Sequence, residues 1–137
     1  MRLTMFTDFG LRVLMRLAGE PNRPFTADEI AVEFRISRHH LTKVVTTLAA
    51  AGIIMTQRGA GGGMWLARSA ETITIGEVVR LLEAKQPLVE CFRADGGACV
   101  LTPHCRLKGK LSAARDAFLC ELDGATLAEC AYAPAPG

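Results

Sequence analysis

Apolar residues recur at helical spacing in the first part of the chain. Leu3, Phe6, Val13, Leu14 and Leu17 recur at spacings near 3.6, which predicts a first helix over roughly residues 7–18 with its apolar side on this stripe. The opposite side carries Asp8, Arg12 and Arg16, four residues apart, so Asp8 and Arg12 can pair on the helix surface. Glycine and proline in the stretch 19–24 then predict the end of this helix.

Two more helices follow, separated by a tight turn. Thr26 and Glu29 have the spacing of a capping box, which predicts the start of a short second helix. Ser37 is a good N-cap for a third helix that runs to about Ala51. The buried stripe of that third helix is Leu41, Val44, Val45 and Leu48. Two helices joined by so short a turn predict a helix-turn-helix.

The exposed face of the third helix has the residue types of a DNA-reading surface. Its candidate DNA contacts are Ser37, Arg38, His39, His40, Thr42 and Lys43. The first turns of a recognition helix reach base edges, and the helix dipole favours phosphate at the same end. The alternative interpretation is a solvated face that happens to be basic.

A β-hairpin is predicted directly after this helix. Residues 53–57 and 64–66 form its strands, and the glycine-rich loop between them begins with Arg58 and Gly59. A hairpin in this place is typical of the wing of a winged helix, so Arg58 and Gly59 join the candidate DNA contacts. A phosphate-binding nucleotide loop is disfavoured, because such a loop runs from a strand into a helix and ends in Lys-Ser/Thr.

The remainder of the chain predicts a short helix, an irregular stretch and a long helix. Thr74 and Glu77 form a second capping-box pattern, opening a helix to about residue 83. Residues 88–102 show no periodicity, and Thr102-Pro103 then predicts the start of a long helix to about residue 122.

The long helix carries an apolar seam typical of a coiled-coil-like contact. Its members are Leu107, Leu111, Ala114 and Phe118. We expect this seam to pair with a second copy of the chain in preference to packing back onto its own domain.

Together these elements predict a mainly α fold with a small β-hairpin, built from a winged helix-turn-helix domain and a long C-terminal dimerisation helix. The expected divisions begin with a DNA-binding domain over residues 1–83. A cysteine-containing loop suited to binding a cofactor is expected over 84–105. A dimerisation helix with its following segment is expected over 106–130, and a loose tail over 131–137.

Composition and charge narrow the function. Half of the residues are apolar and 22% are charged, which is an ordinary globular balance. Residues 1–70 hold nine Lys/Arg against five Asp/Glu (+4), and residues 71–137 hold seven against nine (−2). This asymmetry fits an N-terminal half that meets a polyanion, with scatter as the alternative.

The same counts bear on location and on chemistry. Charges interrupt the apolar start, and no apolar run approaches the roughly 20 residues of a membrane span, so we expect a cytoplasmic protein. An enzyme is not expected, because the chain has no Ser/His/Asp arrangement, paired catalytic carboxylates or complete phosphate loop. An electron-transfer protein would not need a wing or a recognition helix.

Five cysteines, all beyond residue 90, are the strongest chemical signal. Cys91, Cys99 and Cys105 have the spacing C-x7-C-x5-C. Structural zinc sites use closer pairs, whereas three thiolates on a loop can hold an iron–sulfur cluster. Zinc and metal-free thiols stay open as alternatives. A fourth ligand would come from His104, Cys120, Cys130, a carboxylate or a small molecule. Cys120 is expected near the buried side of its helix, where a cysteine acts as a small apolar residue. Cys120 and Cys130 are therefore not included among the candidate cluster ligands.

The chain resembles the NsrR type of nitric-oxide-sensing repressor, in the wider family that includes IscR and RirA. The resemblance rests on the opening Met-Arg-Leu-Thr-x-Phe-Thr-Asp-Phe-Gly-Leu-Arg-Val-Leu, on Ser-Arg-His-His-Leu-Thr-Lys-Val-Val in the third helix, and on the Arg-Gly-Ala-Gly-Gly-Gly wing. Ile-Gly-Glu-Val-Val-Arg at 75–80 and Cys-Arg-Leu-Lys at 105–108 also match.

This resemblance implies a homodimer that binds a palindromic DNA operator and responds to nitric oxide. It implies that Cys91, Cys99 and Cys105 hold an iron–sulfur cluster, [4Fe-4S] or, after exposure to oxygen, [2Fe-2S]. The fourth ligand implied is Asp8 of the partner subunit, with Arg12 coupling the cluster to DNA binding. The alternative for Asp8 is an ordinary surface carboxylate paired with Arg12.

Two branches of the family compete with this assignment. The IscR type has a histidine three residues after the third cysteine, where this chain has Lys108. The RirA type responds to iron and can share the cysteine spacing, but it lacks an aspartate equivalent to Asp8. An iron-responsive regulator or a zinc- or thiol-based redox sensor is therefore the alternative to a nitric-oxide sensor.

Overall fold

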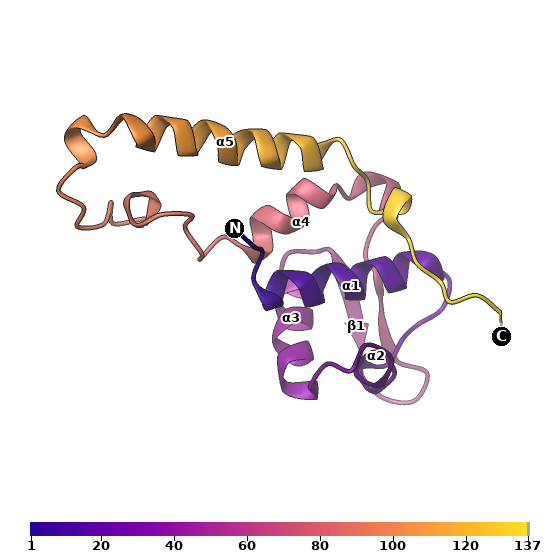
Figure 1. Ribbon diagram of the computed structural model, residues 1–137. Coiled ribbons are helices and arrows are strands. Elements are labelled where there is room, and N and C mark those ends of the chain that lie inside the picture. Colours follow the sequence, from indigo (N-terminus) through magenta and orange to yellow (C-terminus); the bar gives the residue numbers. More distant parts are fainter. Residues whose placement is uncertain (137) are drawn as a thin grey trace.

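The computed structural model describes residues 1–136 and is mainly α-helical, with one antiparallel hairpin (Figure 1). In chain order its helices and strands are α1 (Met5–Gly19), α2 (Ala27–Phe34), α3 (Arg38–Ala50), β1 (Ile54–Gln57), β2 (Gly63–Leu66), α4 (Ile75–Leu82) and α5 (Arg106–Asp123). Four 3-10 turns lie between and after them: η1 (Ala70–Thr72), η2 (Glu90–Phe92), η3 (Thr102–His104) and η4 (Ala128–Cys130). This architecture confirms the predicted fold class.

Side-chain caps start the helices where the sequence carries Ser or Thr. The Thr26 and Glu29 capping box forms completely at α2, as predicted. The second predicted capping box forms only in half. Thr74 accepts the N–H of Glu77, but the Glu77 carboxylate pairs with Arg68 instead of returning to Thr74.

The helix-turn-helix is confirmed. Arg35 ends α2 in the left-handed conformation (φ 55°, ψ 42°), which turns the chain sharply towards α3. Ser37 then caps α3 by accepting the N–H of His40 at 3.2 Å. The hairpin follows with Ile54 opposite Leu66.

A single apolar core joins α1, α3, α4 and the hairpin. The residues that are completely buried in it include Val13, Leu14, Ile30, Leu41, Val44, Leu48, Ile73, Val78 and Leu127. Leu127 comes from the segment after α5, where Thr126 forms a β-bridge with Thr74. The C-terminal segment is therefore part of the winged-helix body.

The long helix begins later than predicted. Residues 102–104 form a separate 3-10 turn, and α5 starts at Arg106 because Cys105 has an extended backbone (φ −82°, ψ 111°) that breaks the helix. The prediction that Thr102 caps this helix is wrong.

The predicted seam of α5 is divided between two environments. Phe118 packs with Leu119 and Leu122 against the chain's own core, so the expectation that the whole seam faces a second copy is wrong for Phe118. Leu107, near the start of α5, is 60% exposed, and Figure 1 shows this end of α5 extending beyond α4.

Two other expectations, for Arg16 and for Cys120, need correction. Arg16, assigned to the exposed stripe of α1, is buried because α2 brings Glu33 against it and Phe25 lies under its guanidinium. Cys120 is exposed and does not lie on a buried side of α5. In the expected loose tail, the N–H of Tyr132 donates to the Met15 carbonyl at 2.9 Å, and Gly137 lies outside the described residues.

No helix within residues 1–136 is both long enough and apolar enough to cross a membrane.

Candidate DNA-binding surface and cysteine loop

The N-terminal turns of α3 present a basic and polar face. Arg38, His39, His40, Thr42 and Lys43 are all exposed there. Two hydroxyls at this end bond to the backbone of α3 itself. Ser37 accepts the N–H of His40, and Thr42 donates to the Arg38 carbonyl at 2.8 Å. The longer cationic and imidazole side chains therefore form the outer surface of this helix.

Two of these residues already have neighbours in the free protein. Arg38 forms an ion pair with Asp28 of α2, whose side chain is 79% exposed. The ring of His40 lies 6.4 Å from the ring of Phe9 on α1. Sequence reasoning did not find Asp28 or Phe9, because both contacts join separate elements.

The hairpin tip is the second part of the predicted DNA surface. Arg58 and Gly59 are exposed between β1 and β2, and Gly59 has φ 92°, a conformation that favours glycine. In Figure 1 the tip and the N-terminal end of α3 both lie at the lower edge of the molecule, away from α5.

The three candidate cluster ligands lie along the connection between α4 and α5. Cys91 lies in η2, and Cys105 directly precedes α5. The loop folds back on itself, because the N–H of Ala98 donates to the Glu90 carboxylate at 3.0 Å. This contact places Cys91 and Cys99 on adjoining parts of the loop.

The loop is attached to α5, which is in turn anchored to α4. The Arg115 guanidinium lies 4.8 Å from the centre of the Phe92 ring. At the far end of α5, Arg80 donates to the Asp123 carboxylate. This hydrogen bond raises the pKa of Arg80 and lowers the pKa of Asp123 below its usual value.

The structure does not bring the three cysteines together. Within residues 1–136, no three Cys, His, Asp or Glu side chains converge into a group able to hold a metal ion. The donor set nevertheless fits an iron–sulfur cluster chemically, because thiolates are its usual ligands and Cys91, Cys99 and Cys105 are free and half-buried. Holding a cluster would require the loop to draw these thiols together.

Asp8 lies on α1 and is held by Arg12 of the same helix. Arg12 donates to both Asp8 carboxylate oxygens, at 3.0 and 2.8 Å, and the Asp8 side chain is 49% exposed. The Arg12 guanidinium also lies 5.9 Å from the centre of the Phe9 ring. Arg12 therefore stands between Asp8 and the Phe9–His40 contact that leads to α3.

A carboxylate that sequence reasoning missed joins α4 to α1. Glu83, the C-cap residue directly after α4, accepts hydrogen bonds from Thr4 and Thr7. The N-cap signal of Thr4 could have been read from the sequence, but its partner lies 79 residues away. No local pattern predicts such a contact.

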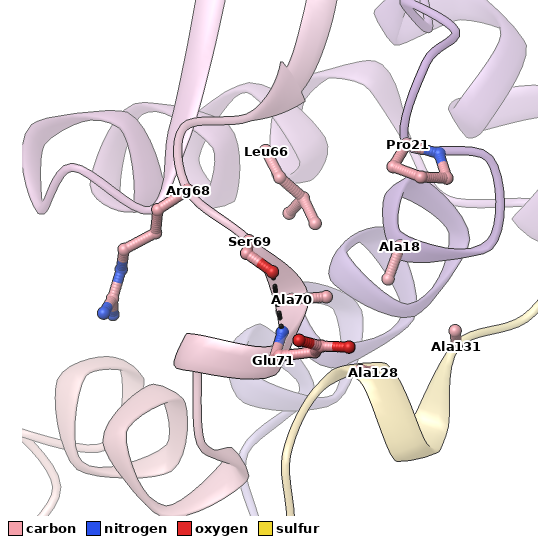
Figure 2. Close-up of a pocket in the computed structure, with 9 residues that line it drawn as sticks. All are labelled: Ala18, Pro21, Leu66, Arg68, Ser69, Ala70, Glu71, Ala128 and Ala131. Carbon is pink, nitrogen blue, oxygen red and sulfur yellow. Dashed lines mark hydrogen bonds between the residues drawn. The ribbon is translucent and has the colours of Figure 1, made fainter.

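A separate shallow pocket lies among the C-terminal end of α1, η1 and η4 (Figure 2). Small side chains such as Ala18 and Ala128 line much of it. Two of its polar side chains are engaged: the Ser69 hydroxyl accepts the backbone N–H of Glu71, and Arg68 pairs with Glu77. The pocket contains none of the predicted site residues.

Sequence comparison gives a consistent picture. Residues 3–132 match the family model described as "Rrf2: Iron-dependent Transcriptional regulator". The HTH-type transcriptional regulator NsrR of Geobacillus kaustophilus is 47% identical over 130 residues, covering 94% of this chain and 88% of the relative. NsrR of Bacillus subtilis is 45% identical over 128 residues, covering 93% and 88%. These relatives are transcriptional regulators and not enzymes.

Solved structures share the fold. CymR, described as the global cysteine regulator of B. subtilis, is 29% identical with a TM-score of 0.76, covering 96% of each chain. The IscR structure of T. potens has a TM-score of 0.75, covering 94% of this chain and 85% of that one. Its identity is 23%, so it supports the fold alone.

Proposed function

Because this chain belongs to the Rrf2 family of transcriptional regulators and to its NsrR type, we propose that it is a cytoplasmic, homodimeric repressor that senses nitric oxide through an iron–sulfur cluster. The observation that carries the proposal is the extent of the relationship. The NsrR relatives align over 93–94% of the chain, which takes in the cysteine loop and α5 as well as the winged helix.

The DNA-binding part of the proposal assigns one role to each exposed element. The first turns of α3, with Arg38, His39 and Lys43, enter the major groove, and Arg58 at the hairpin tip approaches the neighbouring backbone. In a two-fold symmetric dimer the two copies of α3 would read palindromic half-sites about one helical turn apart.

The dimer is proposed from the exposed end of α5. Leu107 of α5 is 60% exposed, and Leu101, in the loop that precedes α5, is 65% exposed. Exposed apolar side chains on a helix that extends beyond its own core are typical of an interface with a second copy. The other end of α5 remains attached to its own domain through Phe118.

The sensing site is proposed to consist of Cys91, Cys99 and Cys105, with Asp8 of the partner subunit as fourth ligand. When bound, an iron–sulfur cluster supplies iron atoms that react with nitric oxide. Asp8 has two alternative partners, Arg12 of its own helix and the cysteine loop across the dimer. Since Arg12 contacts Phe9, which faces His40, a change of partner at Asp8 alters the surroundings of α3.

A visible absorption spectrum of protein purified without oxygen, before and after nitric oxide, tests this function. We expect a broad iron–sulfur band that nitric oxide bleaches in proportion to the amount added. A colourless protein that takes up no iron on anaerobic reconstitution would leave a winged-helix DNA binder without the proposed sensor.

The second candidate function is a thiol-based redox regulator. The free, half-buried thiols of Cys91, Cys99 and Cys105 favour it, and one similar solved structure, 27% identical, is the oxidized form of Staphylococcus aureus CymR. This candidate predicts a colourless protein whose DNA affinity changes with thiol oxidation, so the same spectrum separates the two functions.

A further inference from the structure

We infer that Glu83 is a positioning residue: it ties the root of the cysteine loop to the helix that carries Asp8, and so passes changes in the loop to the recognition helix of the same subunit. The inference rests on the proposed function, because it concerns how the loop controls DNA binding.

The Glu83 carboxylate is held on both oxygens by the first turn of α1. Its Oε1 accepts the backbone N–H of Thr4 at 3.0 Å. Its Oε2 accepts the hydroxyls of Thr4 at 2.6 Å and of Thr7 at 2.8 Å. Thr7 is completely buried, and Thr4 is the N-cap of α1. Hydrogen bonds to a charged group are stronger than neutral ones, so these three fix the end of α4 to the start of α1.

Glu83 also marks the place where the cysteine loop leaves the body of the protein. It directly follows α4, and the irregular segment that contains the three cysteines begins at the next residue. Figure 1 shows the N-terminus of the chain beside this end of α4. Asp8 follows Thr7 directly, and its N–H donates to the Thr4 carbonyl at 3.0 Å. The residues that Glu83 holds are therefore those that orient Asp8.

The next turn of α1 connects this joint to the recognition helix. A methyl group added to Gly10 would collide with Leu82, the residue before Glu83, and would lie 3.5 Å from a methyl group of Val44 on α3. Leu82 and Val44 are both buried. Close-packed contacts in a protein interior transmit displacement instead of absorbing it. A shift of the first residues of the cysteine loop therefore moves α1 through the hydrogen bonds of Glu83. The displacement of α1 then reaches α3 through the contact of Gly10 with Val44.

The experiment compares Glu83→Gln and Thr7→Val with wild type and with Glu77→Gln. Glu77→Gln is the matched control, because it removes the same charge from α4 at a surface pair with Arg68. For each protein, the affinity for an operator fragment, selected with the wild type, is measured with and without the reconstituted cluster. We expect the affinity with the cluster to exceed the affinity without it by a ratio of about 5 to 150 in the wild type and the control. In Glu83→Gln this ratio should fall below about 3. Thr7→Val keeps the side-chain shape and removes one of the three hydrogen bonds, so it should give an intermediate ratio.

Hydrogen exchange in the cluster-free proteins gives an independent readout. Glu83→Gln should lose protection at the amides of residues 8–11, and the control should keep it. A ratio that stays at the wild-type value in both Glu83→Gln and Thr7→Val would overturn the inference and leave Glu83 as a structural cap. If Glu83→Gln does not fold, Thr7→Val decides alone. A wild-type ratio of one would overturn the proposed function and this inference together.

Discussion

Arg16 buries a guanidinium group between two carboxylates and an aromatic ring. Its Nε lies 2.9 Å from Glu33, its Nη1 lies 2.6 Å from Glu20, and its guanidinium lies 4.6 Å from the centre of the Phe25 ring. Burial by itself lowers the pKa of Arg16, but the hydrogen bonds and charges of Glu20 and Glu33 outweigh burial and raise it. Arg16 therefore joins α1 to α2 as a permanent cation.

Replacing Arg16 should destabilise the protein far more than replacing Arg12. Arg16→Met removes a buried cation and leaves Glu33 unpaired, which we expect to cost about 1–3 kcal/mol of unfolding free energy. Arg12→Met on the exposed side of the same helix should cost roughly 0.2–1 kcal/mol. Urea unfolding measures both. Equal losses would show that the Arg16 pair acts like an ordinary surface ion pair.

Asp28 restrains a residue that we propose to contact DNA. The Asp28 carboxylate pairs with Arg38 at the start of α3 and would also lie close to DNA phosphate. Asp28→Asn should therefore raise DNA affinity by about 2- to 5-fold, the range of an exposed ion pair. Asp116→Asn on α5 makes the same change in net charge away from α3 and should leave affinity unchanged. Fluorescence anisotropy of labelled DNA at fixed salt concentration measures the affinity of each variant. Equal effects of the two variants would argue against a local role for Asp28.

The exposed polar face of α3 could be predicted from the sequence, whereas the residues that connect α3 to the start of the cysteine loop could not. Arg38, His39 and Lys43 follow from a local apolar stripe and an N-cap. Glu83 meets Thr7 across 76 residues, a contact that depends on how α1 packs against α4. Pairings of this kind arise from tertiary structure and leave no periodic signal.

At the scale of elements, the start of α2 depends on a capping box that responds to pH. The pKa of Glu29 lies below its usual value, chiefly because the backbone N–H of Thr26 hydrogen-bonds to its carboxylate; burial opposes this, and Arg23 adds to the lowering. Because the pKa in the folded protein is depressed, the stabilisation is complete above the ordinary carboxyl pKa, about 4.3, and is lost as the pH falls through the folded value.

Glu29→Gln should therefore destabilise the protein at neutral pH and have little effect in acid. Glutamine can still cap Thr26 but loses the charge that faces Arg23, so we expect a loss of about 0.5–1 kcal/mol at pH 7. Urea unfolding at pH 7 and at about pH 3 measures the difference, which should disappear at the lower value. Glu71→Gln, at an exposed position of η1, is the control. A loss that is independent of pH would contradict this account of the cap.

The start of α5 shows where local signals are insufficient. Thr102 and Pro103 have the pattern of a helix start, and they do begin a helical turn, but that turn is a 3-10 turn ending at His104. Cys105 then adopts an extended backbone before α5. Nothing in the residue types distinguishes a short 3-10 turn from the first turn of a long helix. The Cys105 thiol thus lies in this break between the turn and the helix.

At the scale of the whole molecule, α5 divides its apolar side chains between the body and the proposed partner. Leu107→Glu should abolish the dimer without lowering monomer stability. The Leu107 side chain is 60% exposed in the single chain and therefore contributes little to that chain's own core. Lys110→Glu, at an exposed position of the same helix, is the control for added negative charge and should remain dimeric. Sedimentation equilibrium measures the oligomeric state of each variant. A dimeric Leu107→Glu protein would place the interface elsewhere.

The winged helix could be predicted almost completely because its signals are local: caps, apolar stripes and a glycine-rich turn. Two features required the complete fold. Leu127 is buried because the segment after α5 returns to pair with Thr74, and no pattern near Leu127 predicts that return. The three cysteines were proposed as ligands from their spacing, but spacing does not fix how the loop folds, and within residues 1–136 the three do not converge into one group.

We propose that nitric oxide controls DNA binding through a cluster on the cysteine loop. The direct test is a titration of the anaerobically reconstituted protein with nitric oxide, following visible absorption and the anisotropy of labelled operator DNA in the same sample. We predict that the absorption band and DNA affinity fall together, with affinity decreasing by about 5- to 150-fold. A band that bleaches completely while DNA affinity stays constant would contradict the account.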